Sequence, residues 1–171
     1  MILKGGCLCE AVQYQWQGAS ASASYCHCTD CRKATGGPYT VGVGVDPAGL
    51  TIPSGKIKGY TKIADSGKKI TREFCPECVS PLFTRAEACP GIVFIKAGSL
   101  DSPQLVEPTH QTWIEMAVPW AYLDKDLPGF EGNGPSPGEK TRQGVHSVSP
   151  VMDSLRRNPY DSTPFTLLFW G

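Results

Sequence analysis

The chain has 171 residues, with 16 basic and 16 acidic side chains and a formal net charge of zero. This length suits one domain with its own core. The balanced charge provides no broad positive field for a phosphate backbone, so we do not expect a nucleic-acid partner. No apolar run reaches the roughly 18 residues of a membrane span, and the first residues lack a secretory leader. We therefore expect a cytoplasmic protein that is not bound to a membrane.

The pattern of apolar residues predicts short strands and frequent turns, in keeping with the 19 glycines and 15 prolines. Residues 11–17 alternate apolar and polar, the period of a half-buried strand. A helical turn is expected after Thr29 and Asp30, and Gly36 should end it. Residues 41–45 alternate valine with glycine, which indicates a strand over 39–45 with one bare face. Further strands are expected at 57–62, 69–75, 82–85, 92–97 and 112–116.

The last part of the chain differs in composition from the rest. Residues 128–150 are rich in Pro, Gly and Ser and have no apolar period, so they are typical of a linker or long loop. Residues 165–170 are mostly apolar. We expect one zinc-binding domain over residues 1–126, followed over 127–171 by a Pro/Gly-rich linker and a docked tail. The tail would pack on the domain or on a sister subunit, forming a homo-oligomer.

Seven of the eight cysteines fall into three groups with the spacing of metal chelates. The groups are Cys7-Leu8-Cys9, Cys26-His27-Cys28-Thr29-Asp30-Cys31 and Cys75-Pro76-Glu77-Cys78. Disulfides are the alternative, but rings within such short groups would be strained and a reducing compartment opposes them. The spacing therefore predicts zinc. The eighth, Cys89, has no partner group and is expected to be an inert thiol.

Seven ligands divide naturally into four and three. All three sulfurs of the compact group, Cys26, Cys28 and Cys31, can reach one ion. Cys7, Cys9, Cys75 and Cys78 are then left to share a second ion in a closed structural site. The three-cysteine site has an open position. Three thiolates leave bound zinc with a net charge of minus one, which favours a soft substrate thiol as the fourth ligand over an activated water.

Several residues near the open site are candidates for further roles. Arg32 and Lys33 follow the compact group and could offset charge or hold a substrate carboxylate, with Arg32 favoured by its planar fork; solvated surface cations are the alternative. The side chain of His27 should point away from the metal, as the middle residue of an extended Cys-x-Cys segment. His110 could contact substrate or be an ordinary strand histidine.

The chain resembles the family of glutathione-dependent formaldehyde-activating enzymes, also called the centromere protein V type, within the Mss4-like fold. The resemblance covers roughly residues 3–123 and rests on four segments: residues 6–12, 26–36, 74–78 and 97–101. It implies a mainly β domain of several small coiled sheets. It also implies a structural zinc on Cys7, Cys9, Cys75 and Cys78 and a catalytic zinc on Cys26, Cys28 and Cys31.

Two features depart from this family. Val79 stands where the family usually has glycine, in a place suited to positive φ, so we expect an altered turn there. The long C-terminal segment is the other departure, and it could reshape access to the open site.

The function expected from the sequence is that of a zinc-dependent carbon–sulfur lyase. Two zinc ions per chain, glutathione as co-substrate and a small carbonyl such as formaldehyde complete this expectation, with Cys26, Cys28, Cys31 and Arg32 as the catalytic group. One alternative is a related zinc enzyme acting on a specialised metabolite. The other is a non-catalytic binding module stabilised by zinc.

Overall fold

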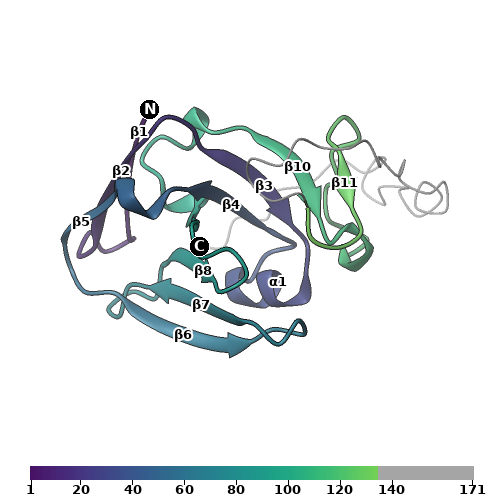
Figure 1. Ribbon diagram of the computed structural model, residues 1–171, viewed down its shortest axis with the longest axis horizontal. Coiled ribbons are helices and arrows are strands. Elements are labelled where there is room, and N and C mark those ends of the chain that lie inside the picture. The colour runs from purple at the N-terminus through teal and green to yellow at the C-terminus, as the bar shows by residue number, and fades with distance from the viewer. Residues whose placement is uncertain (135–171) are drawn as a thin grey trace, which may run out of the picture.

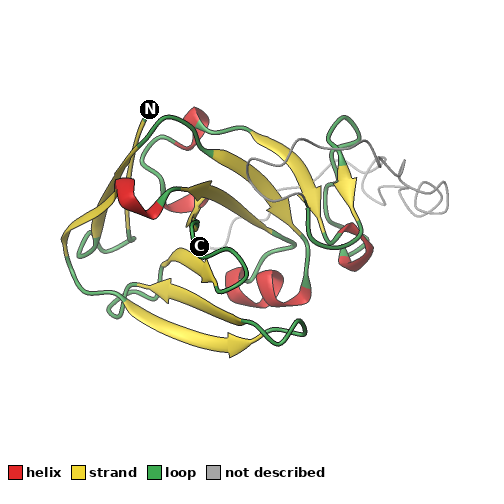
Figure 2. Cartoon of the chain, in the orientation of Figure 1, coloured by secondary structure: helices red, strands yellow, loops and turns green. Residues whose placement is uncertain are grey.

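The structure is a computed structural model that describes residues 1–134. In this part the chain forms two sheets and one α-helix (Figures 1 and 2). The smaller sheet has the order β1 (Ile2–Gly6), β2 (Gln13–Gln17), β5 (Leu50–Ser54). The larger has the order β11 (Gly129–Phe130), β10 (Pro108–Thr112), β3 (Ser22–Cys26), β4 (Thr40–Val45), β9 (Val93–Lys96), β8 (Pro81–Ala86), β7 (Lys69–Phe74), β6 (Lys58–Ile63). The mainly β fold predicted from the sequence is confirmed.

The two faces of the larger sheet differ in chemistry. Ala23, Val43, Ile95 and Phe83 lie opposite one another on successive strands, and all four are buried. The smaller sheet packs against this apolar face, where Tyr14 meets Phe83 edge to face at 4.9 Å between ring centroids. Because side chains alternate across a strand, the residues between these four point to the other side.

This second face, which we call the polar face, carries the residues paired in the alternate register. They are Ser24, Cys26, Thr40, Gly42, Lys96, Phe94, Thr84 and Arg72. The helix α1 (Thr29–Thr35) covers this face, since Asp30 pairs with Lys62 of β6 and with Arg72 of β7. Figure 1 shows α1 between β4 and the β6–β7 pair. The segment from Cys26 to the start of α1 therefore lies between the helix and the polar face.

Most predicted elements are present, with shifts of one or two residues. The helix ends as expected at Gly36, which adopts a φ of 69°. The strand predicted at 112–116 is wrong, because Trp113 takes a φ of 57° and ends β10 at Thr112. Residues Ile114–Met116 then form a 3-10 turn. The strands β1, β3, β5 and β11 were not predicted, and neither was β10 before Thr112.

Regular structure continues past residue 126 to β11. Gln111 N donates to Pro128 O at 2.8 Å, Trp113 N donates to Gly132 O at 3.0 Å, and β11 pairs in parallel with β10. This strand lies just beyond residue 126, where the sequence places the end of the zinc-binding domain. The predicted docked tail and its contact with a sister subunit lie outside the described residues.

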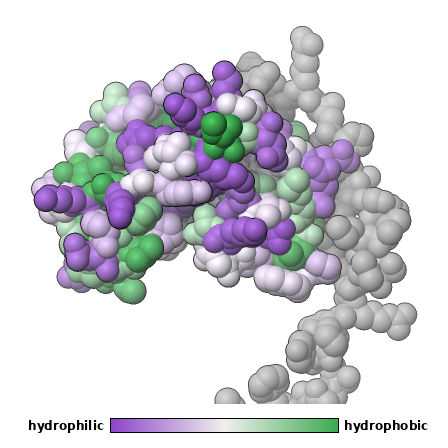
Figure 3. Space-filling model, turned by 90° about the horizontal axis from the view of Figure 1, so that it is seen from below, coloured by the Kyte–Doolittle hydropathy of each residue, from purple (hydrophilic) through white to green (hydrophobic). Residues whose placement is uncertain are grey.

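The exposed surface of the described residues mixes polar and apolar side chains. On the face in Figure 3, hydrophilic groups predominate and the apolar ones form separate small groups. Exposed aromatic side chains include Tyr60, Trp120 and Tyr122. Among residues 1–134, no helix has the length and apolar character needed to cross a bilayer.

Candidate metal centres

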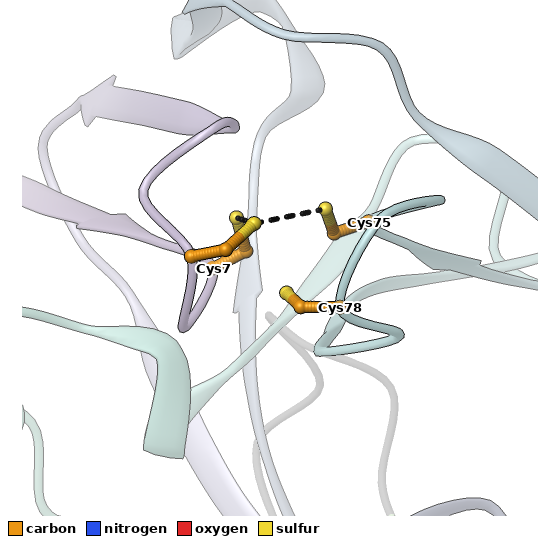
Figure 4. A group of neighbouring side chains, drawn as sticks. Cys7, Cys75 and Cys78 are labelled. Atoms are coloured by element: carbon orange, nitrogen blue, oxygen red, sulfur yellow. Dashed lines mark hydrogen bonds between the residues drawn. The ribbon is translucent and has the colours of Figure 1, made fainter.

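The first thiol cluster joins two turns that are distant in sequence. Cys7 and Cys9 lie in the turn between β1 and β2, while Cys75 and Cys78 lie in the turn between β7 and β8. Figure 4 shows the sulfurs of Cys7, Cys75 and Cys78 facing the space between the two turns. All four sulfurs lie within 4.8 Å of one another. The grouping predicted from spacing is thus present in the structure.

The distances within this cluster fit a tetrahedral ion. Zinc–sulfur bonds of about 2.3 Å place neighbouring sulfurs about 3.8 Å apart. The Sγ atoms of Cys7 and Cys9 lie 3.5 Å apart, and those of Cys9 and Cys75 lie 3.8 Å apart. Cys75 is fully buried at the edge of the apolar core. Four sulfurs at these distances suit a closed structural site.

Ser80 links the two turns of this site, a role that the sequence did not reveal. Its Oγ accepts a hydrogen bond from Leu8 N at 3.0 Å and lies 3.2 Å from the sulfur of Cys78. The hydrogen bonds from Ser80 lower the pKa of Cys78 to about 5. A lowered thiol pKa favours the thiolate, the form that binds a metal.

Both turns contain a non-glycine residue in the left-handed region. Glu10 follows Cys9 with a φ of 63°, and Val79 follows Cys78 with a φ of 61°. The altered turn expected from Val79 is therefore wrong. Its backbone keeps the positive φ that glycine would adopt, and Val79 N donates to Cys75 O at 3.0 Å.

The second cluster lies on one short segment at the end of β3. Cys26 is the last residue of that strand, Cys28 is the N-cap of α1, and Cys31 lies in the first turn of the helix. Their sulfurs also lie within 4.8 Å of one another. All three side chains are half-buried. Among the described residues, no histidine, carboxylate or further cysteine joins them as a fourth ligand.

The electrostatics of this cluster favour an anionic sulfur on Cys28. Hydrogen bonds with the thiols of Cys26 and Cys31, assisted by the backbone N–H of Cys31 and Asp30, lower the pKa of Cys28 to about 2. The distance from Cys31 N to Cys28 Sγ is 3.4 Å. Interactions with Cys26 and Cys28 raise the pKa of Cys31, so a metal that binds all three sulfurs must displace protons.

Arg32 lies on the helix next to this cluster. It is half-buried, and one terminal nitrogen donates to Thr29 Oγ1 at 3.2 Å. Its Nε is buried and has no hydrogen-bond partner in the described part of the chain. Lys33 is exposed. Of the two predicted cations, Arg32 therefore keeps a buried donor that a ligand could use.

The two histidines of the described residues, His27 and His110, are buried and half-buried. His27 is fully buried and packs edge to face on Tyr39 at 5.3 Å between centroids. Burial lowers its pKa, which favours the neutral ring. His110 lies in β10 beside Thr109 and Phe130, and burial lowers its pKa as well. His27 is not among the metal-ligating atoms of the cluster.

Cys89 stands apart from both clusters. It is half-buried and lines an open cleft of about 370 Å³, together with Lys69, Arg85 and Glu87. None of the seven clustered cysteines lines this cleft. Among residues 1–134 all eight cysteines are free thiols, so the disulfide alternative finds no support.

These features define a β-sheet protein with two unequal cysteine clusters, each able to hold a metal ion. Residues 2–116 match the family described as glutathione-dependent formaldehyde-activating enzyme, and because this match covers more than half of the chain, the chain belongs to that family. A crystal structure of a Rhodobacter sphaeroides protein is similar, with a TM-score of 0.49 and 20% identity. The similarity covers 61% of this chain and 96% of that one. No curated protein matches the chain.

Proposed function

We propose that this protein is a zinc-dependent lyase that forms and breaks the bond between the sulfur of glutathione and the carbon of formaldehyde. Family membership supports the choice of glutathione and formaldehyde. The reducing cytoplasm is the compartment that suits seven clustered free thiols. Two zinc ions per chain would occupy the two clusters, the four-cysteine site for structure and the three-cysteine site for chemistry.

The observation that carries this proposal is the difference between the clusters. One has four sulfurs joining two distant turns, with two of the cysteines buried, whereas the other has three half-buried sulfurs on a six-residue segment. Structural zinc sites are usually filled by four protein ligands, and catalytic sites keep a position for substrate. Zinc bound to three thiolates would accept a substrate thiol there and stabilise its thiolate form.

The residues of the chain supply the rest of the site. Cys28 provides a sulfur whose anionic form is stabilised by backbone N–H groups, and Cys31 is fixed on the first turn of α1. The buried Nε of Arg32 is a donor for one carboxylate of glutathione. Asp30, two residues before Arg32, anchors this end of the helix through its ion pairs with Lys62 and Arg72.

The reaction is an addition and its reverse. In the forward direction glutathione loses its thiol proton, the thiolate sulfur bonds to the carbonyl carbon, the carbonyl π pair moves to oxygen, and that oxygen takes a proton. In the reverse direction the hydroxyl loses its proton, the carbon–sulfur bond breaks and the carbonyl re-forms. No oxidant or reductant is needed, so thiol positioning and charge stabilisation are sufficient.

The test is the rate of adduct formation from glutathione and formaldehyde by the purified zinc-loaded protein. We expect a rate above the uncatalysed background for the wild type and a loss of at least about a hundredfold for Cys28→Ser. Cys89→Ser is the matched control and should retain the wild-type rate. Formaldehyde would be abandoned as substrate if the wild type did not exceed the background and Cys28→Ser gave the same rate.

Thiol binding tests the open position directly. With cobalt in place of zinc, glutathione should change the sulfur-to-cobalt absorption bands of the three-cysteine site. A response to other thiols but not to glutathione would favour a different metabolite. Spectra insensitive to every thiol, with both ions saturated by protein ligands, would support a binding module.

A further inference from the structure

Lys96, the last residue of β9, is an unusual residue on the polar face of the sheet. It is only 7% exposed although it carries an ammonium group. Its Nζ donates to Thr40 Oγ1 at 3.3 Å. Among the described residues, no carboxylate lies within ion-pair distance of this nitrogen. Because a buried charge is costly without a compensating one, the structure calls for an anion close to Lys96.

The register of the sheet places Lys96 beside the three-cysteine cluster. Thr40 lies directly opposite Cys26 in the antiparallel pair of β3 and β4. Directly opposed side chains in such a pair have Cβ atoms about 5 Å apart. Lys96 lies opposite Gly42, two residues along β4 from Thr40 and therefore on the same face. Its side chain thus reaches the hydroxyl that is the cross-strand neighbour of the first cysteine ligand.

The electrostatic environment of Lys96 agrees with this placement. Burial lowers the pKa of Lys96, and the charge of Arg72 lowers it further, whereas the thiolates of Cys31, Cys26 and Cys28 raise it. The neighbouring cations of β6 and β7 are already paired. Arg72 and Lys62 both contact the carboxylate of Asp30, at 3.4 and 2.8 Å. Lys96 is left as the buried cation of this face whose natural counter-charge is the thiolate cluster.

The net charge of the metal-bound cluster would be negative, so a nearby cation would stabilise it. A divalent ion with three thiolates has a net charge of minus one, and a fourth thiolate from substrate makes it minus two. We propose that Lys96, held by Thr40, is a positioning residue whose ammonium group offsets this negative charge and so favours binding of the substrate thiolate. This inference rests on the proposed function, in which a thiol completes the three-cysteine site.

The experiment compares thiol binding to the cobalt-loaded full-length protein. Glutathione is titrated into each protein while the sulfur-to-cobalt bands are followed. The proteins are the wild type, Lys96→Met, Lys96→Arg and the exposed-lysine control Lys58→Met. Lys96→Met keeps the length of the side chain and removes its charge. We expect it to weaken glutathione binding roughly tenfold, the size expected for one unit charge about 12 Å away at an effective dielectric constant near 20. Lys96→Arg should restore most of the affinity, and Lys58→Met should match the wild type.

Two further measurements keep the result interpretable. Thr40→Val removes the hydroxyl that holds Nζ and leaves the charge, so it should weaken glutathione binding about threefold even if Lys96→Met fails to fold. Competition with a chelator measures cobalt affinity at each cluster without any thiol. Lys96→Met should weaken retention at the three-cysteine cluster and leave the four-cysteine cluster unchanged, since loss of a purely structural residue would affect both.

The outcomes separate this inference from the proposed function. If the wild type binds glutathione and both Lys96→Met and Thr40→Val bind it equally well, the inference is overturned and the proposed function stands. If the wild type shows no thiol response but Lys96→Met loses cobalt selectively from the three-cysteine cluster, the charge-balancing role stands and the proposed function fails. Unchanged cobalt affinity at that cluster, together with unchanged glutathione binding, would exclude the role of Lys96.

Discussion

Substituting one cysteine from each cluster should separate folding from chemistry. Cys75 is fully buried, and its cluster joins turns whose residues Cys9 and Cys75 are 66 positions apart. Binding of structural zinc contributes about 10–16 kcal/mol in zinc-finger peptides, as much as the whole stability of a typical domain of about 5–15 kcal/mol. Losing one of four ligands removes a large part of this energy. We therefore expect Cys75→Ser to be mostly unfolded at 25 °C.

Cys31→Ser should have a much smaller effect on folding. The cluster of Cys26, Cys28 and Cys31 joins only the end of β3 to the helix that follows it, and β3 is already held by β4 and β10. We expect Cys31→Ser to stay folded, with a free energy of unfolding within about 2 kcal/mol of the wild type, the scale of an ordinary substitution.

The assay is urea unfolding followed by circular dichroism at fixed free zinc, combined with metal analysis. The wild type should hold two ions per chain, and folded Cys31→Ser should keep the ion of the four-cysteine site while losing affinity at the other. Cys89→Ser serves as the control and should unfold like the wild type. Equal unfolding of Cys75→Ser and Cys31→Ser would show that the division between a structural and a chemical cluster is wrong.

Three further predictions concern residues outside the thiol clusters. Val79→Gly should raise the free energy of unfolding by about 0.5–1 kcal/mol in urea melts. The reason is that the left-handed strain of valine, about 1–2 kcal/mol, exceeds the entropy cost of glycine. Lower stability of the variant would refute strain at this residue. Gly5→Ala should lower it by more than about 2 kcal/mol, since a Cβ would collide with Ser99 O and the Tyr14 ring, and a wild-type melting curve would contradict this packing. Burial lowers the pKa of His110, so its contribution is present above about pH 6.5 and is lost as the pH falls through the folded pKa. His110→Gln should flatten the dependence of stability on acid pH, and an unchanged slope below that pH would exclude His110 as its source.

The local sequence correctly predicted those strands and helix ends whose structure depends mainly on neighbouring residues. The alternation in β2 and β4 and the stop at Gly36 follow from side-chain period and backbone preference, and each is present. The strand β3 was missed because its sequence Ser-Ala-Ser-Tyr-Cys has mostly small residues and no strong apolar alternation. Its position comes from pairing with β4 and β10, which local sequence does not reveal.

The same distinction applies to the candidate metal centres. Chelate spacing placed all seven cysteines in the correct two groups because sulfurs two or three positions apart can converge on one point, and the two pairs left beside the compact group then combine. Lys96 and Ser80 were not identified because neither belongs to a motif. Lys96 meets the three-cysteine cluster only through cross-strand register, and Ser80 meets Leu8 across 72 residues. Long-range pairing therefore supplies the surroundings of the ligands, while local spacing supplies the ligands themselves.

The residue after each second cysteine shows how strongly the four-cysteine site constrains its backbone. Glu10 and Val79 are not glycines, yet both have φ near 60°, and their N–H groups donate to Cys7 O and Cys75 O. A β-branched residue such as valine pays the highest steric cost in that region. A cost of about 1–2 kcal/mol is small beside the energy of a four-thiolate zinc site. The convergence of the four sulfurs can therefore hold the turn in place, so glycine at position 79 is favourable but not required.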